Sequence, residues 1–218
     1  MPGVSDRNAI DWIYKNGMVD KRSPGRAIYD DLMDAAEDER CPLCGWGRVS
    51  QLDHFVPKSS FPALCVDPLN LIPACGECNR TKGEYWSADV SGTLLHPYLD
   101  RVDGDQWLDA RVIHDDPLRL AFFVTVPPTW GDVLAARVHH HFNRFGLAKL
   151  YASQANRTLR NIQQSLAGQL RAGGEAMVRA YLLDAAASRL AVEYNGWEGV
   201  TYRTLAADDA FCCGAFLR

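Results

Sequence analysis

Four of the seven cysteines form two Cys-x-x-Cys pairs about thirty residues apart, Cys41/Cys44 and Cys75/Cys78. Paired thiolates at this spacing suit tetrahedral zinc, and four thiolates leave no coordination position open for a substrate. We therefore predict a structural Zn²⁺ site whose binding free energy helps a small segment to fold. A glycine follows one cysteine of each pair and is expected to ease each tight turn.

Polar residues between and after these pairs have types that suit hydrolysis. Asp53-His54 follows a β-like stretch, Asn70 precedes an apolar run, and Asn79 comes directly after the last cysteine. A neutral imidazole can take a proton from water at cellular pH. One carboxylate and one amide oxygen are hard ligands that leave most of the coordination shell of Mg²⁺ or Mn²⁺ to water and phosphate. Metal-assisted hydrolysis of a phosphodiester needs this combination.

The order of these motifs carries a resemblance to a known family. A cysteine pair is followed by Asp-His-hydrophobic-x-Pro, then by Asn-Leu, then by a second cysteine pair, and then by Asn79 and a basic residue. This order resembles the HNH endonuclease family, the ββα-metal nucleases, over about 45 residues or a fifth of the chain. Asn79 stands where the three-letter name has its last histidine, which marks the H-N-N variant of that family.

The resemblance implies a role for each matching residue. Asp53 resembles the carboxylate ligand of the catalytic divalent ion, and His54 resembles the general base. Asn70 resembles the residue that orients that histidine, and Asn79 resembles the second metal ligand. From the full set of motifs we predict a DNA endonuclease whose cleavage depends on Mg²⁺ or Mn²⁺.

Several basic residues in this segment are candidates for contacts to nucleic-acid phosphates. Lys82 lies three residues after Asn79, one helical turn along the same face. Lys58 and Arg80 are further candidates for nucleic-acid binding, as is Arg48. For each of them, an ordinary solvated side chain is the alternative.

Two other functional classes stay open from the sequence alone. The same fold can serve as a non-catalytic zinc-stabilised module that binds nucleic acid or protein. The motif also does not separate DNA from RNA, so an RNA-cleaving toxin nuclease is a further alternative. For biological context we predict a bacterial anti-phage defence effector with a partner protein such as an ATPase or sensor. A restriction or mobile-element nuclease is the main rival.

Charge is distributed unevenly along the chain. The net charge is −4, yet residues 132–180 contain seven basic and two acidic residues, a difference of +5. This asymmetry allows a basic binding face on an acidic protein, whereas an ordinary solvated helix surface is the alternative.

Sequence patterns predict helices, one hairpin and a mostly helical α+β fold. Helices are expected over 8–15 and from Ser23-Pro24, with Ser23 as N-cap and Pro24 as the first helical residue. Further helices are expected over about 130–145, 147–170, 175–194 and 204–213, with strands over 107–114 and 118–126. The expected segments are an N-terminal helical segment (1–40), a zinc-stabilised ββα-metal (HNH) core (41–96), a linker with the β-hairpin (97–128) and a C-terminal helical region (129–218).

The run of three histidines and the absence of long apolar segments exclude two further interpretations. His139, His140 and His141 resemble a metal cluster, but consecutive helical residues point about 100° apart and cannot converge on one ion. No apolar run reaches the roughly 18 residues that a membrane helix needs, and the N-terminus has no apolar signal core. We therefore expect a cytoplasmic protein without a membrane partner.

Overall fold

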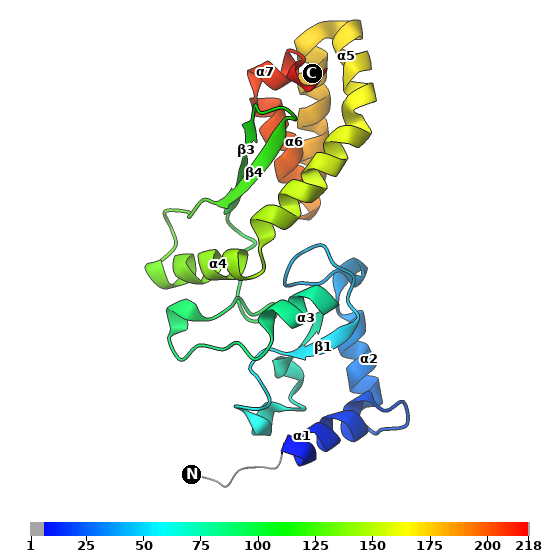
Figure 1. Ribbon diagram of the computed structural model, residues 1–218, viewed down its shortest axis with the longest axis vertical. Helices are drawn as coiled ribbons and strands as arrows, with labels where there is room; N and C mark the ends of the chain where they lie inside the picture. The colour runs from blue at the N-terminus through cyan, green and yellow to red at the C-terminus, as the bar shows by residue number, and fades with distance from the viewer. Residues whose placement is uncertain (1–6, 218) are drawn as a thin grey trace. The chain divides into compact units, whose positions relative to one another are not determined.

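The structure is a computed structural model that describes residues 7–217 (Figure 1). The chain divides into two compact units. Unit 1 contains residues up to 100 together with 136–145, and unit 2 contains residues 101–135 together with 146 onward.

Unit 1 is built on a short β-hairpin with helices packed around it. Its elements in chain order are α1 (Arg7–Tyr14), a π-helical turn (Lys15–Val19), α2 (Arg26–Asp34), β1 (Gln51–His54), β2 (Leu71–Ala74) and α3 (Gly76–Lys82). β1 and β2 pair antiparallel, with Asp53 opposite Ile72 and His54 opposite Leu71. Because α3 follows β2 almost directly, these three elements form a ββα unit. Short 3-10 turns complete the unit at Glu37–Glu39, Pro62–Leu64, Pro68–Asn70 and Val90–Gly92.

A small apolar cluster fixes the N-terminal helices on this hairpin. Leu52 of β1 and Leu71 of β2 are buried against Met18, and α2 contributes Leu32 and Met33. The last residues of α4 (Asp132–Arg144), from Ala136 on, also belong to unit 1. There Arg137 bonds the carboxylate of Asp100 and donates to the Leu94 carbonyl at 2.7 Å.

Unit 2 packs a second hairpin against a long helical pair. β3 (Leu108–Ile113) and β4 (Arg119–Val124) are antiparallel. They lie beside α5 (Leu147–Val192) and α6 (Trp197–Ala207), as Figure 1 shows. The short α7 (Asp209–Cys212) and a 3-10 turn (Ala215–Leu217) follow. Asn195 anchors the start of β3, because its Oδ1 accepts hydrogen bonds from the amides of Trp107 and Leu108 at 2.8 and 3.1 Å.

Several predicted elements are confirmed. The hairpin turns at residues 115–117 as expected, and its Asp116–Pro117 peptide is cis. Gly146, with φ of 60°, separates α4 from α5. α5 is two helical arms rather than one rod, because Gly174 has φ 69° and ψ −161° and breaks the helix where the sequence predicts a stop.

Three predicted helix starts are wrong. α2 begins at Arg26 with Gly25 as its N-cap, because Ser23-Pro24 is used in the preceding turn. α4 begins at Asp132 instead of residue 130. α6 begins at Trp197, well before the expected residue 204, directly after the turn at Gly196.

The architecture is mixed α+β and mostly helical, as predicted, and it includes a four-cysteine cluster. Within residues 7–217, no helix combines the length and apolarity needed to cross a membrane. The four-segment division of the chain and the cytoplasmic location stay predictions.

Candidate metal and hydrolase site

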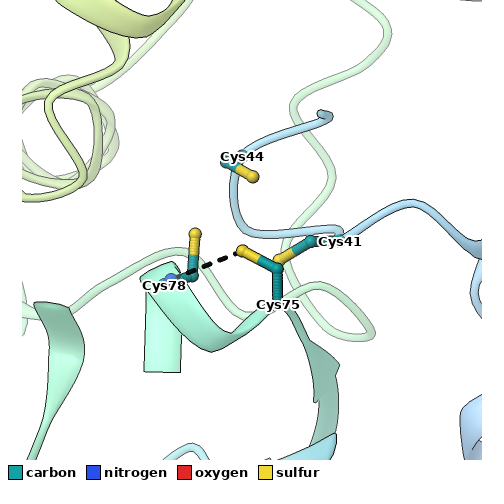
Figure 2. A group of neighbouring side chains, drawn as sticks. All are labelled: Cys41, Cys44, Cys75 and Cys78. Carbon is teal, nitrogen blue, oxygen red and sulfur yellow. Dashed lines mark hydrogen bonds between the residues drawn. The ribbon is translucent and has the colours of Figure 1, made fainter. Parts of the chain in front are cut away.

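The two cysteine pairs converge on one point in unit 1. The sulfur atoms of Cys41, Cys44, Cys75 and Cys78 all lie within 4.8 Å of one another, and all four residues are buried. Figure 2 shows that one pair comes from the loop before β1 and the other from the start of α3. Among the described residues, this is the one group of cysteine, histidine or acidic side chains with the geometry to hold a metal ion.

Backbone amides support the sulfur atoms of this cluster. The amide of Gly47 donates to Cys44 Sγ and the amide of Cys78 donates to Cys75 Sγ, each at 3.4 Å. Gly45 has φ of 63°, so the first turn needs the glycine that the sequence analysis identified. Gly47 is a second requirement, because a Cβ built on it would lie 2.7 Å from Cys75 Sγ. A Cβ on Gly76 would meet nothing within 4 Å, so the second turn does not depend on its glycine.

Four thiol groups this close together cannot all ionise easily, because the thiolate charges repel one another unless a cation lies between them. Hydrogen bonds from Cys41 and Cys78 lower the pKa of the Cys44 thiol to about 2, whereas hydrogen bonds with Cys41 and Cys44, together with burial, raise the pKa of the Cys78 thiol. The cluster therefore resists forming four thiolates until a positive ion balances their charge. The geometry and the four-sulfur donor set fit a structural zinc ion.

His141 supports the first cysteine turn from a distant part of the sequence. Its Nε2 lies 2.8 Å from the Leu43 carbonyl, between the two cysteines of the pair, and its Nδ1 accepts the amide of Leu95 at 3.3 Å. Since a carbonyl can only accept, Nε2 carries the proton and the ring is neutral. Burial lowers the pKa of His141 to about 4. The sequence pattern argues against His141 as a metal ligand but gives no sign of this structural role.

Asp53 is buried in β1 and faces Lys82 of α3. The Nζ of Lys82 lies 3.2 Å from Oδ2 and 3.4 Å from Oδ1 of Asp53. Burial raises the pKa of Asp53 to about 6, although the ammonium of Lys82 opposes the shift. Within residues 7–217 the buried Oδ2 atom accepts no hydrogen bond of good geometry, so its other lone pairs are available to a ligand.

Lys82 therefore differs from the exposed phosphate contact that the sequence suggested. The side chain is 1% exposed and also donates to the Gly83 carbonyl at 3.1 Å. A buried ammonium needs a negative partner, and Asp53 provides it. Lys82 lies in α3 one turn after Asn79, and its side chain points toward β1 and away from solvent.

His54 is held by a carbonyl on one side and a ring on the other. Its Nε2 lies 2.9 Å from the Cys65 carbonyl, so this nitrogen donates and Nδ1 keeps the free lone pair of a neutral ring. The ring of Tyr14 meets it edge-on, with centroids 4.6 Å apart. Burial lowers the pKa of His54, and the charge of Lys58 acts in the same direction. At neutral pH the imidazole is therefore the unprotonated form that can accept a proton.

Asn70 organises the loop that supplies this carbonyl, but it does not contact the imidazole in the described residues. Its Oδ1 accepts the Val56 amide at 2.8 Å, and its Nδ2 donates to the carbonyls of Val56 and Leu64 at 3.2 and 3.0 Å. Leu64 directly precedes Cys65. Asn70 thus holds the backbone of the loop between β1 and β2, next to the carbonyl that His54 contacts.

Asn79 lies half-buried in α3. Lys82, which contacts Asp53, lies one helical turn further along the same helix. No hydrogen bond of the Asn79 side chain occurs among the residues that the structure describes. A buried carboxylate oxygen and an amide oxygen, both with lone pairs to spare, fit the preference of Mg²⁺ or Mn²⁺ for hard ligands.

The remaining phosphate candidates lie at the edge of unit 1 and are paired. Lys58 bonds Asp11 at 2.6 Å, and its Nζ lies 5.2 Å from the Tyr14 ring centroid, beside His54. Arg80 bonds Glu77 at 2.5 Å, and Arg48 bonds Glu39 at 2.7 Å. Exposed ion pairs of this kind contribute little stability, so each base can exchange its partner for a phosphate.

Comparison with known proteins finds two relatives and no structural precedent. The chain is 29% identical over 224 residues to protein ea31 of Escherichia phage lambda, covering 94% of this chain and 74% of that protein. It is 33% identical over 60 residues to Septu protein PtuB of Bacillus thuringiensis, covering 28% of this chain and 23% of PtuB. No protein-family model and no solved structure matches the chain. The chain is thus similar over most of its length to a phage protein and over a shorter stretch to PtuB.

Proposed function

We propose that this chain is a metal-dependent endonuclease of the HNH type that hydrolyses phosphodiester bonds of DNA. The observation that carries the proposal is the neutral His54 ring, fixed through Nε2 beside the buried carboxylate of Asp53 in β1. The ββα order of β1, β2 and α3 beside a four-cysteine cluster supports membership of this nuclease class.

In this proposal His54 Nδ1 takes the proton of the attacking water. The Cys65 carbonyl keeps the other ring nitrogen protonated, which leaves Nδ1 as the base in the neutral ring. As the proton arrives, the carboxylate of Asp11 favours the imidazolium, whereas the charges of Lys58 and Lys82 oppose it. The ring of Tyr14 limits its rotation.

Asp53 and Asn79 would hold the divalent ion. Mg²⁺ or Mn²⁺ supplies positive charge to the phosphate and to the leaving oxygen when bound. Lys82 would then have to share Asp53 or move away from it. Lys58, whose ammonium lies over the ring of Tyr14, would contact a phosphate of the substrate.

A cleavage assay tests this proposal. Purified protein with added Mg²⁺ or Mn²⁺ should cut plasmid and linear DNA, and His54→Ala should slow cleavage by at least about 100-fold. The matched control is His141→Gln, which alters a buried neutral histidine outside the reacting group. Equal cleavage by the wild type and His54→Ala would contradict the assignment of His54.

A non-catalytic zinc-stabilised binding module is the second candidate. The ion pair between Lys82 and Asp53 favours it, because an ammonium already balances the carboxylate that would hold a divalent ion. An isothermal titration separates the two candidates. Binding of Mn²⁺ that Asp53→Asn abolishes supports the nuclease, whereas zinc as the sole bound metal supports the module.

For biological context we propose a bacterial anti-phage defence or restriction effector that works with a partner protein such as an ATPase or sensor. Similarity to a phage lambda protein and to PtuB supports a phage-related role. Affinity purification of the chain from its native cells tests the partner. Copurification of a stoichiometric ATPase is expected, and a chain that purifies alone would contradict this part of the proposal.

A further inference from the structure

The first arm of α5, residues 147–173, has an unusual charge. It contains four basic residues and no acidic residue, namely Lys149, Arg157, Arg160 and Arg171. The second arm, residues 175–192, contains two acidic and two basic residues. Within α5, the net positive charge is therefore confined to the first arm, in a chain whose net charge is −4.

These four side chains are exposed and unpaired. None of them makes an ion pair or hydrogen bond within the part of the chain that the structure describes. In the second arm, by contrast, Arg179 bonds Glu175 and Asp209 at 2.6 and 2.8 Å, and Arg189 bonds Glu198 at 2.9 Å. The four positive charges of the first arm therefore lie in solvent. No acidic side chain offsets the repulsion among them within the described residues.

Helical spacing places the four residues on one side of the arm. At 100° per residue they fall within an arc of roughly 80°, and Lys149 to Arg171 spans about 33 Å. Most buried residues of this arm, among them Tyr151, Ala155 and Leu166, point to the opposite side, whereas the small buried side chain of Ala167 lies within the arc. We call this set of four exposed bases the α5 stripe.

The surroundings of the α5 stripe indicate the chemistry of its partner. No large hydrophobic side chain of residues 147–173 is exposed, so the apolar anchors of a protein interface are missing. There is also no exposed aromatic ring on which single-stranded bases could stack. Ser153 and Gln164 lie within the same arc and add neutral hydrogen-bonding groups. A polar, purely basic surface of this kind fits nucleic-acid phosphates.

Size and shape favour a DNA duplex. The length of the stripe matches about one turn of B-form DNA, and the major groove of B-form DNA admits an α-helix. The major groove of A-form RNA is too narrow for side chains to read. We propose that the α5 stripe binds the phosphate backbone of double-stranded DNA. This inference goes beyond the proposed function, because the binding requires neither cleavage nor a divalent ion.

Fluorescence anisotropy with a labelled DNA duplex of about 20 base pairs tests the inference. The measurement uses the full chain carrying His54→Ala, without added divalent ions, so its outcome is independent of nuclease activity. In this background, Lys149, Arg157, Arg160 and Arg171 are replaced by Gln together. The matched control replaces Lys15, Lys21, Arg22 and Arg101 by Gln, four exposed bases outside α5 that change the net charge equally. Circular dichroism and thermal melting check that both variants fold.

The α5 stripe variant should weaken duplex binding by about 100-fold or more at low salt. The slope of log affinity against log salt should become shallower by about 3 to 4, because four phosphate contacts are lost. The control should retain most of the affinity and the slope. Equal losses in the two variants, or no binding by the parent chain, would overturn the proposal. Tighter binding to duplex RNA or to polyglutamate than to duplex DNA would overturn the choice of partner.

Discussion

The ammonium of Lys82 neutralises the carboxylate that would hold a divalent ion. This ammonium pairs with Asp53 inside unit 1, where both side chains are buried. Removing one partner of a buried pair leaves an uncompensated charge, which costs more than the pair itself contributes. The same ammonium competes with any divalent ion for the carboxylate.

Replacement of Lys82 by Met should therefore have two opposite effects. Without added divalent ions, Lys82→Met should lower the free energy of unfolding by roughly 3 kcal/mol. With Mn²⁺, its melting temperature should rise more than that of the wild type, because the ion replaces the lost positive charge. Thermal melting with and without Mn²⁺ measures both effects. The double variant Asp53→Asn/Lys82→Met is the control and should not respond to Mn²⁺; an equal response in all three proteins would refute this account of Lys82.

His141 predicts how stability depends on pH. Its pKa falls from 6.5 to about 4 on burial, so between these values the unfolded chain binds a proton that the folded chain does not. The free energy of unfolding should therefore decrease as pH falls from about 6.5 to 4, by up to about 3 kcal/mol. Urea unfolding at pH 7 and pH 5 measures the decrease.

His141→Gln is the control for this dependence. Glutamine can still donate to the Leu43 carbonyl but does not titrate, so the variant should lose less stability between pH 7 and pH 5. Protonation of the cysteines affects both proteins alike. Identical pH dependence in the two proteins would show that His141 does not contribute.

At the scale of elements, the turn between Cys41 and β1 is the most constrained part of the cysteine site. Gly47 lies so close to Cys75 that an added methyl group would come within 2.7 Å of Sγ and 2.8 Å of Cβ. Gly76, at the start of α3, has open space around it.

These two glycines form a matched pair of variants. Gly47→Ala should weaken zinc binding and destabilise unit 1, since the first turn must move away from Cys75. Gly76→Ala should retain zinc and melt near the wild-type temperature. Metal analysis of the purified variants by mass spectrometry measures zinc content; equal zinc retention in both would contradict the packing described for Gly47.

The same elements show what could be predicted from the sequence. The cysteine cluster and Gly45 were predictable, because spacing within a few residues defines such a turn. The break at Gly174 and the hairpin turn could also be predicted, because each depends on residues that are neighbours in the sequence. The contact of His141 with Leu43 was not, because 98 residues separate the two and the run of three histidines does not indicate which one is buried. The pairing of Lys82 with Asp53 was missed for the same reason: it forms only when α3 packs on β1.

For the whole molecule, a zinc ion held by the four cysteines would contribute to the stability of one unit only. The four cysteines of the cluster all belong to unit 1, whereas the buried core of unit 2 is apolar, with Leu108, Leu120, Leu182 and Leu205 fully buried. A structural zinc ion contributes free energy to the fold that it holds together.

Zinc removal should therefore unfold the chain selectively. After treatment with a strong chelator, amide hydrogens of β1, β2 and α3 should lose protection, whereas those of α5 and α6 should remain protected. Hydrogen exchange followed by mass spectrometry measures this residue by residue. Uniform loss of protection in both units, or none in β1 and α3, would contradict a structural zinc site confined to unit 1.

The proposed nuclease function requires Asp53 and Asn79 to hold a catalytic divalent ion close to His54. The most direct measurement is anomalous X-ray diffraction from crystals of the protein soaked in Mn²⁺, because it does not depend on a partner or a trigger for cleavage. The account predicts a manganese peak at the side chains of Asp53 and Asn79, separate from a zinc peak at the four cysteines. A saturating soak that leaves Lys82 on Asp53, with no manganese at these two side chains, would contradict it.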